Sequence, residues 1–141
     1  MLLFANKSLS LKNYFSFLLS ILPISFIAGN LLINANILIL IFSALIFFKS
    51  KIFQIKYYWF DKLLILFFLL VFYTGFYNDY FFYLSELAWK AYFSTVIKSI
   101  FFFRYLFLYL ILRYLVEKQI IDLKPFFITS ALASIFVSFD I

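Results

Sequence analysis

Residues 13–48 form a stretch of 36 residues without one charged side chain. As a single helix this stretch would be about 54 Å long, at about 1.5 Å per residue, whereas the hydrocarbon core of a bilayer is about 30 Å thick. The chain must therefore reverse its direction within it. Gly29-Asn30 is the natural turn, because both residues tolerate the backbone conformations of a tight reversal. We predict one membrane span over residues 11–28 and a second over residues 31–48.

The composition indicates that lipid surrounds most of the chain. Hydrophobic residues make up 67% of the sequence and charged residues only 13%, whereas a soluble domain has about 25% charged residues. In lipid, backbone polar groups must be paired internally, so only helices or a closed barrel can span. A barrel would alternate apolar and polar residues, but residues 63–77 and 105–112 are nearly unbroken apolar runs. The predicted fold class is an all-α integral membrane protein.

Three further apolar segments extend the pattern of spans. We predict them over residues 63–77, 97–116 and 126–141. The last one follows Pro125, is only 16 residues long and has no polar anchor after it, so we expect a truncated span. The sequence therefore predicts about five transmembrane helices. We interpret residues 1–141 as the N-terminal part of a longer polytopic membrane domain.

Two of the connecting segments have distinct compositions. Residues 49–62 hold four lysines and a single acid, Asp61, together with aromatic residues of the kind found at a headgroup boundary, and are predicted as a loop. Residues 78–94 are more mixed. As a helix they would pair Glu86 with Lys90 at i, i+4 and gather apolar residues on one face. We expect this segment to form an interfacial helix along the membrane surface.

The distribution of Lys and Arg between the spans predicts the orientation. If the N-terminus is cytoplasmic, nine of these residues lie on the cytoplasmic side and only Lys90 and Lys98 lie outside. We therefore expect a multi-pass protein with a cytoplasmic N-terminus. A signal peptide is the alternative for the first apolar segment, but a second span follows at once. Pro23, a predicted kink, also lies among side chains bulkier than a cleavage region prefers.

The composition excludes several classes of chemistry. The chain has no cysteine and no histidine, which excludes disulfides, thiolate chemistry and the usual metal sites, and removes the commonest general base. Its two glycines, Gly29 and Gly75, are too far apart for a phosphate-binding loop. We predict no catalytic residue, metal or cofactor in this chain. The net charge of +6 does not indicate nucleic acid, because the basic residues flank apolar segments, and the predicted partner is the lipid bilayer.

Arg104 is the candidate site residue. It lies in the fourth predicted span between apolar side chains, about 9 Å from the outer end of that helix. An arginine at the centre of a span costs about 2.5–3.5 kcal/mol on insertion scales, so such residues usually face a protein interior and often mark a function. A guanidinium suits a diphosphate, because its donors can bind two oxygens at once. The alternatives are that Arg104 snorkels to the outer headgroups or pairs with another helix, for which Asp140 is a candidate partner.

Three other polar residues in the spans have simpler explanations. Arg113 lies near the cytoplasmic end of its span, where snorkelling and a pair with Glu117 explain it. Its spacing of nine residues from Arg104 places the two on opposite helix faces. Asn34 and Asn36 lie near the outer end of the second span. They are expected to hydrogen-bond to neighbouring helices, with the lining of a polar cavity as the alternative.

Parts of the sequence resemble a known family. The LPIS of residues 22–25, the GN of residues 29–30 and the IN of residues 33–34 resemble the first hairpin of bacterial O-antigen ligases and O-antigen polymerases. Residues 98–118 and 126–141 are similar to a later hairpin of the same family. The resemblance extends over most of the chain and rests on motifs that are largely hydrophobic.

The resemblance implies a multi-pass glycosyltransferase of the bacterial inner membrane that acts in lipopolysaccharide biosynthesis. Members of the family use glycans carried on undecaprenyl diphosphate and act on the periplasmic side, which would make Arg104 a contact to the diphosphate. The family's large periplasmic loop, with its functional arginines and histidine, has no counterpart in residues 1–141. The resemblance therefore implies that this chain is inactive alone. The alternative is a non-enzymatic membrane protein, such as a transporter portion or an assembly subunit.

Overall fold

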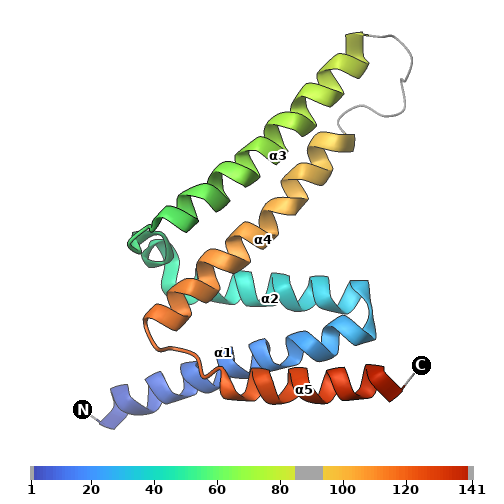
Figure 1. The fold of residues 1–141 in the computed structure, drawn as a ribbon. Helices are drawn as coiled ribbons and strands as arrows, with labels where there is room; N and C mark the ends of the chain where they lie inside the picture. Colours follow the sequence, from blue (N-terminus) through green and yellow to red (C-terminus); the bar gives the residue numbers. More distant parts are fainter. Residues whose placement is uncertain (1, 85–93, 140–141) are drawn as a thin grey trace. The chain divides into compact units, whose positions relative to one another are not determined.

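The computed structural model describes residues 2–84 and 94–139, and the regular secondary structure within them is entirely helical. In chain order the elements are α1 (Leu2–Ala28), α2 (Asn30–Phe48), the 3-10 helix η1 (Lys49–Gln54), α3 (Trp59–Leu84), α4 (Ser94–Glu117) and α5 (Lys124–Phe139) (Figure 1). The predicted all-α fold class is confirmed for the described residues.

Four of the described helical segments are long and apolar enough to cross a membrane: Ser10–Ala28, Asn30–Gln54, Trp59–Phe81 and Ser94–Glu117. The fifth helix, α5, is apolar but has only 16 residues. Large hydrophobic side chains are exposed on these helices, for example Phe26, Leu31 and Phe101. Lipid accommodates such side chains at no cost, whereas water does not. The helices agree with a multi-pass membrane protein.

The chain divides into two compact units. The first comprises Met1–Phe53 with Leu110–Ile141, and the second comprises Gln54–Tyr109. α4 is a continuous helix whose beginning belongs to the second unit and whose end belongs to the first.

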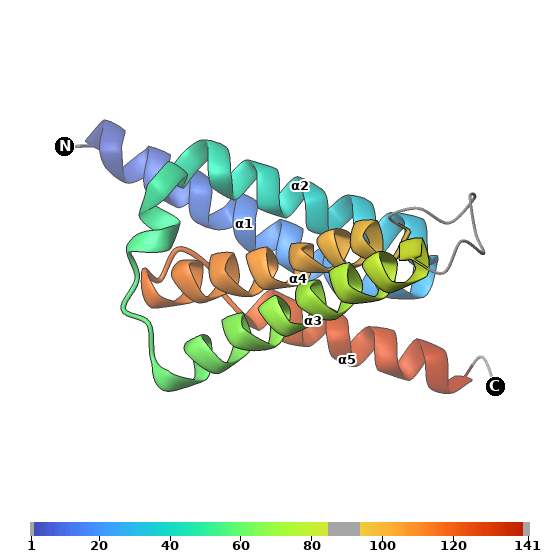
Figure 2. The ribbon, with the colours of Figure 1, turned by 90° about the horizontal axis from the view of Figure 1, so that it is seen from above.

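In the first unit, α1 and α2 pack as a helical hairpin (Figure 2). The reversal occurs at Gly29, whose φ of 119° lies in the region that glycine enters without strain. α1 continues through Pro23, which lacks an N–H and disturbs the helical hydrogen bonds of the preceding turn. Five residues before Pro23, the side-chain amide of Asn36 in α2 donates to the carbonyl of Leu18 at 3.4 Å. α2 thus supplies a polar contact to the part of α1 that precedes the proline.

An aromatic cluster joins three elements of the first unit. The ring of Phe15 in α1 is fully buried and lies 6.1 Å from the ring of Phe47 and 5.5 Å from that of Phe48. Phe48 in turn lies 5.3 Å from Tyr114 near the end of α4. Aromatic pairs at these distances add about 0.5–1.5 kcal/mol to the effect of area burial. The cluster therefore binds the end of the α1–α2 hairpin to the end of α4.

α4 ends in a Schellman motif. Gln119 has a φ of 54°, and its N–H donates to the carbonyl of Val116 at 3.0 Å. The N–H of Ile120 donates to the carbonyl of Leu115 at 2.8 Å. Together these bonds satisfy two carbonyls that the helix end would otherwise leave unpaired. The position with positive φ is usually glycine, and here glutamine occupies it.

After α4, the chain is tied back to α1. The N–H of Asp122 donates to the hydroxyl of the buried Ser16 at 2.8 Å, and the carboxylate of Asp122 accepts the N–H of Lys124 at 3.0 Å. The second bond is an Asx-turn, which directs the chain into α5. α5 then packs along α1 (Figure 1).

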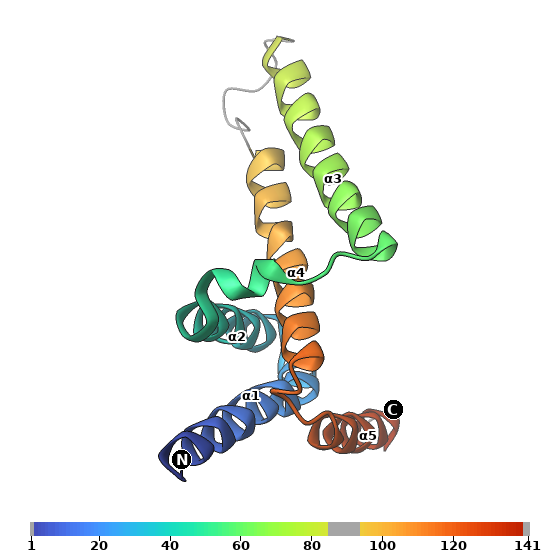
Figure 3. The same ribbon diagram turned by 90° about the vertical axis from the view of Figure 1, so that its left-hand side faces the viewer.

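The second unit is a hairpin of α3 and the first part of α4, which run alongside each other (Figure 3). At one end, the carboxylate of Asp79 accepts the backbone N–H of Thr95 at 3.1 Å and that of Val96 at 2.8 Å. These N–H groups belong to the first turn of α4, where no helical partner exists for them. A side chain of α3 therefore caps the following helix.

The middle of this hairpin combines a close backbone approach with aromatic packing. A Cβ added to Gly75 would lie 2.7 Å from Oγ of Ser99 and 3.2 Å from the carbonyl oxygen of Thr95. The ring of Phe68 lies 5.4 Å from that of Phe102. The absence of a side chain at Gly75 thus permits this close contact, and a larger residue there would push α3 and α4 apart.

At the other end of the hairpin, Asp61 is buried in the first turn of α3, with only 2% of its surface exposed. It accepts the hydroxyl of Tyr109 at 2.6 Å and the backbone N–H of Tyr58. A buried carboxylate needs such donors, because burial without them is costly. The contact fixes the beginning of α3 to α4.

α3 and α4 extend beyond the boundaries predicted for the third and fourth spans. α3 covers Trp59–Leu84, so it is longer than the predicted 63–77 and includes the first residues of the segment 78–94 that was predicted as an interfacial helix. Asp79 is one of the polar residues at which the predicted span ended. It lies within α3, because backbone N–H groups of α4 donate hydrogen bonds to its carboxylate. Residues 85–93, with the predicted Glu86–Lys90 pair, lie outside the described residues.

The predicted loop 49–62 is shorter in the structure, because η1 and the first turn of α3 occupy both of its ends. α4 starts at Ser94, three residues before the predicted Ile97, and α5 starts at Lys124.

Candidate functional site

Arg104 lies close to the middle of α4. It follows Ser94 by ten residues, or about 15 Å along the helix, instead of the predicted 9 Å, because the helix begins earlier than its apolar run. The flanking residues are apolar or aromatic, and the side chain is partly buried. α4 therefore holds a guanidinium at a depth where an apolar helix offers few partners.

The hydrogen bonds of Arg104 are incomplete among the described residues. Its Nη2 donates to the hydroxyl of Tyr105 at 2.9 Å, and its Cζ lies 4.8 Å from the centre of the Tyr105 ring. The Nε atom is buried and meets no acceptor in the described part of the chain. A buried donor without an acceptor is unfavourable, and the effect is larger for a charged group. An oxyanion beside Nε would supply the acceptor and neutralise the charge.

The structure separates the other predicted polar residues into different roles. Asn36 is buried between α1 and α2, and besides its bond to α1's backbone it donates to Oγ of Ser25 at 3.3 Å. This confirms the predicted hydrogen bonding between neighbouring helices. Asn34 instead donates to the side chain of Asn30, four residues earlier in α2, at 3.1 Å.

The proposed partners of the two arginines remain predictions. Asp140 lies outside the described residues, so its pairing with Arg104 is not described. Arg113 lies in the part of α4 that belongs to the first unit, whereas Arg104 belongs to the second. The i, i+4 pair of Arg113 with Glu117 stays a prediction.

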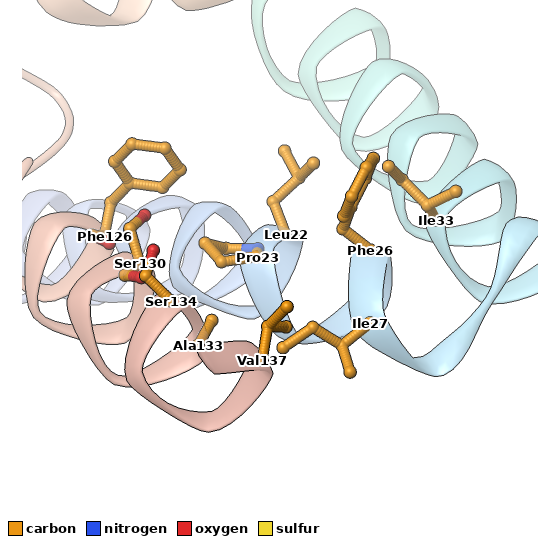
Figure 4. Close-up of a pocket in the computed structure, with 10 residues that line it drawn as sticks. All are labelled: Leu22, Pro23, Phe26, Ile27, Ile33, Phe126, Ser130, Ala133, Ser134 and Val137. Carbon is orange, nitrogen blue, oxygen red and sulfur yellow. Dashed lines mark hydrogen bonds between the residues drawn. The ribbon is translucent and has the colours of Figure 1, made fainter. Parts of the chain in front are cut away.

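An apolar groove lies in the first unit. Its volume is about 530 Å³, and α1, α2 and α5 line it (Figure 4). Leu22, Pro23 and Phe26 face it from α1, and Phe126 and Val137 face it from α5 (Figure 4). Two hydroxyls at its edge, those of Ser130 and Ser134, donate to carbonyls of their own helix at 2.8 and 2.9 Å. The groove therefore presents hydrocarbon and suits an apolar chain.

Sequence reasoning did not identify the roles of the two acids in α3. Asp61 was assigned to a loop and Asp79 to a surface helix, yet each forms hydrogen bonds with α4. One signal was present in the sequence: an acidic residue lies at each end of the third apolar segment, and possible hydrogen-bond donors lie at both ends of the fourth. Without the register of the hairpin, this signal does not specify a partner.

Among residues 2–84 and 94–139, no group of His, Cys, Asp and Glu side chains is placed to hold a metal ion. Comparisons of the chain with protein-family models, with curated proteins and with solved structures find no match. Any functional assignment must therefore rest on the residues themselves.

Proposed function

We propose that this chain provides membrane spans of a glycosyltransferase of the O-antigen ligase or polymerase type, which takes glycan from undecaprenyl diphosphate. Arg104 carries the proposal. It is a partly buried guanidinium within an apolar helix, and its Nε meets no acceptor among the described residues. A diphosphate offers several charged oxygens to such a fork of donors. In this proposal Arg104 binds the diphosphate, and other parts of the enzyme provide the chemistry.

A second feature agrees with a carrier of this kind. The groove of about 530 Å³ between α1, α2 and α5 is apolar, which suits an isoprenoid chain. The two features belong to different units of the chain and support the proposal independently.

The proposal includes a location in the bacterial inner membrane with the N-terminus in the cytoplasm. The absence of native cysteine makes single-cysteine labelling a clean test. In intact cells, a membrane-impermeant maleimide should label Asn30→Cys, beside the α1–α2 turn, and should not label Ser50→Cys in η1. After lysis both should react. Labelling of Ser50→Cys alone in intact cells would reverse the orientation.

The role of Arg104 is tested in cells that depend on the gene encoding this chain. Arg104→Lys keeps the charge but loses the fork of donors, and Arg104→Ala loses both. We expect glycan transfer to fall about tenfold or more in Arg104→Lys and further in Arg104→Ala, at normal protein abundance. Arg113→Lys, in the same helix, is the matched control and should retain most of the transfer.

Normal transfer by both Arg104 variants, at normal abundance, would overturn the diphosphate role. The alternative of a transporter portion or assembly subunit makes a different prediction. In that case loss of the gene would leave glycan transfer in isolated membranes unchanged, when carrier and acceptor are both supplied.

A further inference from the structure

A groove of about 350 Å³ lies between α3 and α4 in the second unit. Its lining changes along the hairpin. Asn78 and Lys98 line the end near the start of α4, whereas Phe67, Val71 and Phe102 line the part farther along. One end can therefore hold a polar group, and the other offers only hydrocarbon surface.

The polar end of this groove is cationic. The ammonium of Lys98 has three donors and the amide of Asn78 has two, and both side chains are exposed. Asp79 lies at the same end and attracts Lys98. However, its carboxylate accepts the N–H groups of Thr95 and Val96, so it is directed at the beginning of α4. The charge that lines the groove is that of Lys98.

The dimensions of the groove match one end of a lipid. Lys98 and Phe102 are separated by four residues, or about 6 Å, and Asn78 and Phe67 by eleven, or about 16 Å. This spans a phosphate and the first part of an acyl chain. A lysine in the second turn of a membrane helix also extends readily toward headgroups.

We propose that this groove binds an anionic phospholipid, with the lipid phosphate on Lys98 and Asn78 and an acyl chain along Val71 and Phe102. The site is distinct from Arg104. Arg104 follows Lys98 by six residues, which at about 100° each places it on a different face of α4. The inference therefore stands whether or not Arg104 binds a diphosphate.

The first test uses the purified 141-residue chain in detergent, titrated with phosphatidylglycerol or phosphatidylcholine and examined by native mass spectrometry. The chain should retain one phosphatidylglycerol about tenfold more strongly than phosphatidylcholine, because both lipids offer a phosphate to Lys98 but the choline cation of phosphatidylcholine repels its ammonium group. Lys98→Gln should abolish this preference. Lys118→Gln, another exposed lysine outside the groove, is the matched control and should keep it.

A second variant tests the hydrocarbon end and leaves the charge unchanged. Val71→Trp should fill the groove and lower retention of phosphatidylglycerol about tenfold. Leu69→Trp, on an exposed part of α3 that does not line the groove, should have little effect. Circular dichroism confirms that each variant keeps its helices.

Soluble glycerol 3-phosphate distinguishes a lipid from a free phosphate, because it lacks the acyl chains. A large excess should not displace the retained phosphatidylglycerol. Full displacement would identify a site for soluble phosphate compounds and overturn the proposal. Equal retention of the two lipids by the wild-type chain, or equal losses in Lys98→Gln and Lys118→Gln, would also overturn it.

Discussion

Gly75 of α3 and Ser99 of α4 lie in contact without room for a methyl group between them. A Cβ at Gly75 would lie 2.7 Å from Oγ of Ser99 and 3.1 Å from its Cβ. Helix association in lipid depends on van der Waals packing and polar contacts, because apolar side chains gain little by leaving lipid for another helix. This small-residue contact is therefore central to the α3–α4 hairpin.

Replacing Gly75 by valine should push the two helices apart. We expect the free energy of unfolding in detergent to fall by about 1–3 kcal/mol, the usual effect of overpacking. The double variant Gly75→Ala with Ser99→Gly should be more stable than the sum of its single changes predicts, because the second change removes the atoms that the first would meet. Additive effects would show that the contact is not specific.

Asp79 should contribute to stability as the cap of α4. Asp79→Ala leaves the first N–H groups of α4 without their acceptor, and we expect a loss of about 1–2 kcal/mol. Asp79→Asn keeps an oxygen acceptor but loses the negative charge that favours a helix N-terminus, so its effect should be smaller. The measurement is reversible unfolding in mixed micelles. A loss in Asp79→Asn as large as that in Asp79→Ala would contradict a hydrogen-bonded cap.

Tyr109 should stabilise the hairpin through its hydroxyl. Tyr109→Phe removes one donor from the buried Asp61 and should cost about 1.5–3 kcal/mol, the range for hydrogen bonds to charged groups. Tyr73→Phe is the matched control, because Tyr73 is exposed on α3. Its unfolding free energy should stay within about 0.5 kcal/mol of the wild type. Equal effects of the two changes would rule out a specific role for the Tyr109 hydroxyl.

Gln119 offers a stabilising substitution. A non-glycine residue with positive φ costs roughly 1–2 kcal/mol, and Gln119→Gly should recover about 1 kcal/mol of this. A thermal melt should shift upward for Gln119→Gly. Lys118→Gly changes the neighbouring position, where no positive φ occurs, and should lower the melting temperature.

Asn36 should contribute modestly to the α1–α2 hairpin. Asn36→Leu removes its donors to Leu18 and Ser25, and polar contacts between membrane helices average about 0.6 kcal/mol, with a maximum of about 1.7. We expect a loss within this range by unfolding in micelles. Asn34→Leu, which breaks a bond only within α2, should cost less.

The sequence by itself predicted the helical class, the reversal at Gly29 and about five apolar helices, of which four are long enough to span and the last is short. These features depend on the length of apolar runs, on the thickness of a bilayer and on the backbone freedom of one residue, all of which can be judged locally. It also identified Arg104 as an unusual residue, because a cation surrounded by apolar neighbours is visible in the sequence. It did not predict that α4 begins at Ser94, and it therefore placed Arg104 too close to a helix end.

The tertiary structure alone decided which polar residues meet. Asp79 lies within α3 because Thr95 and Val96, 16 and 17 positions later in the chain, donate their N–H groups to its carboxylate. Similarly, the hydroxyl of Ser16 accepts the N–H of Asp122, 106 positions later. Gly75 became a helix contact, and Lys98 became one end of a groove, only through the register of α3 against α4. Such pairings depend on which helix faces which, and apolar periodicity that is uniform around a membrane helix carries little of that information.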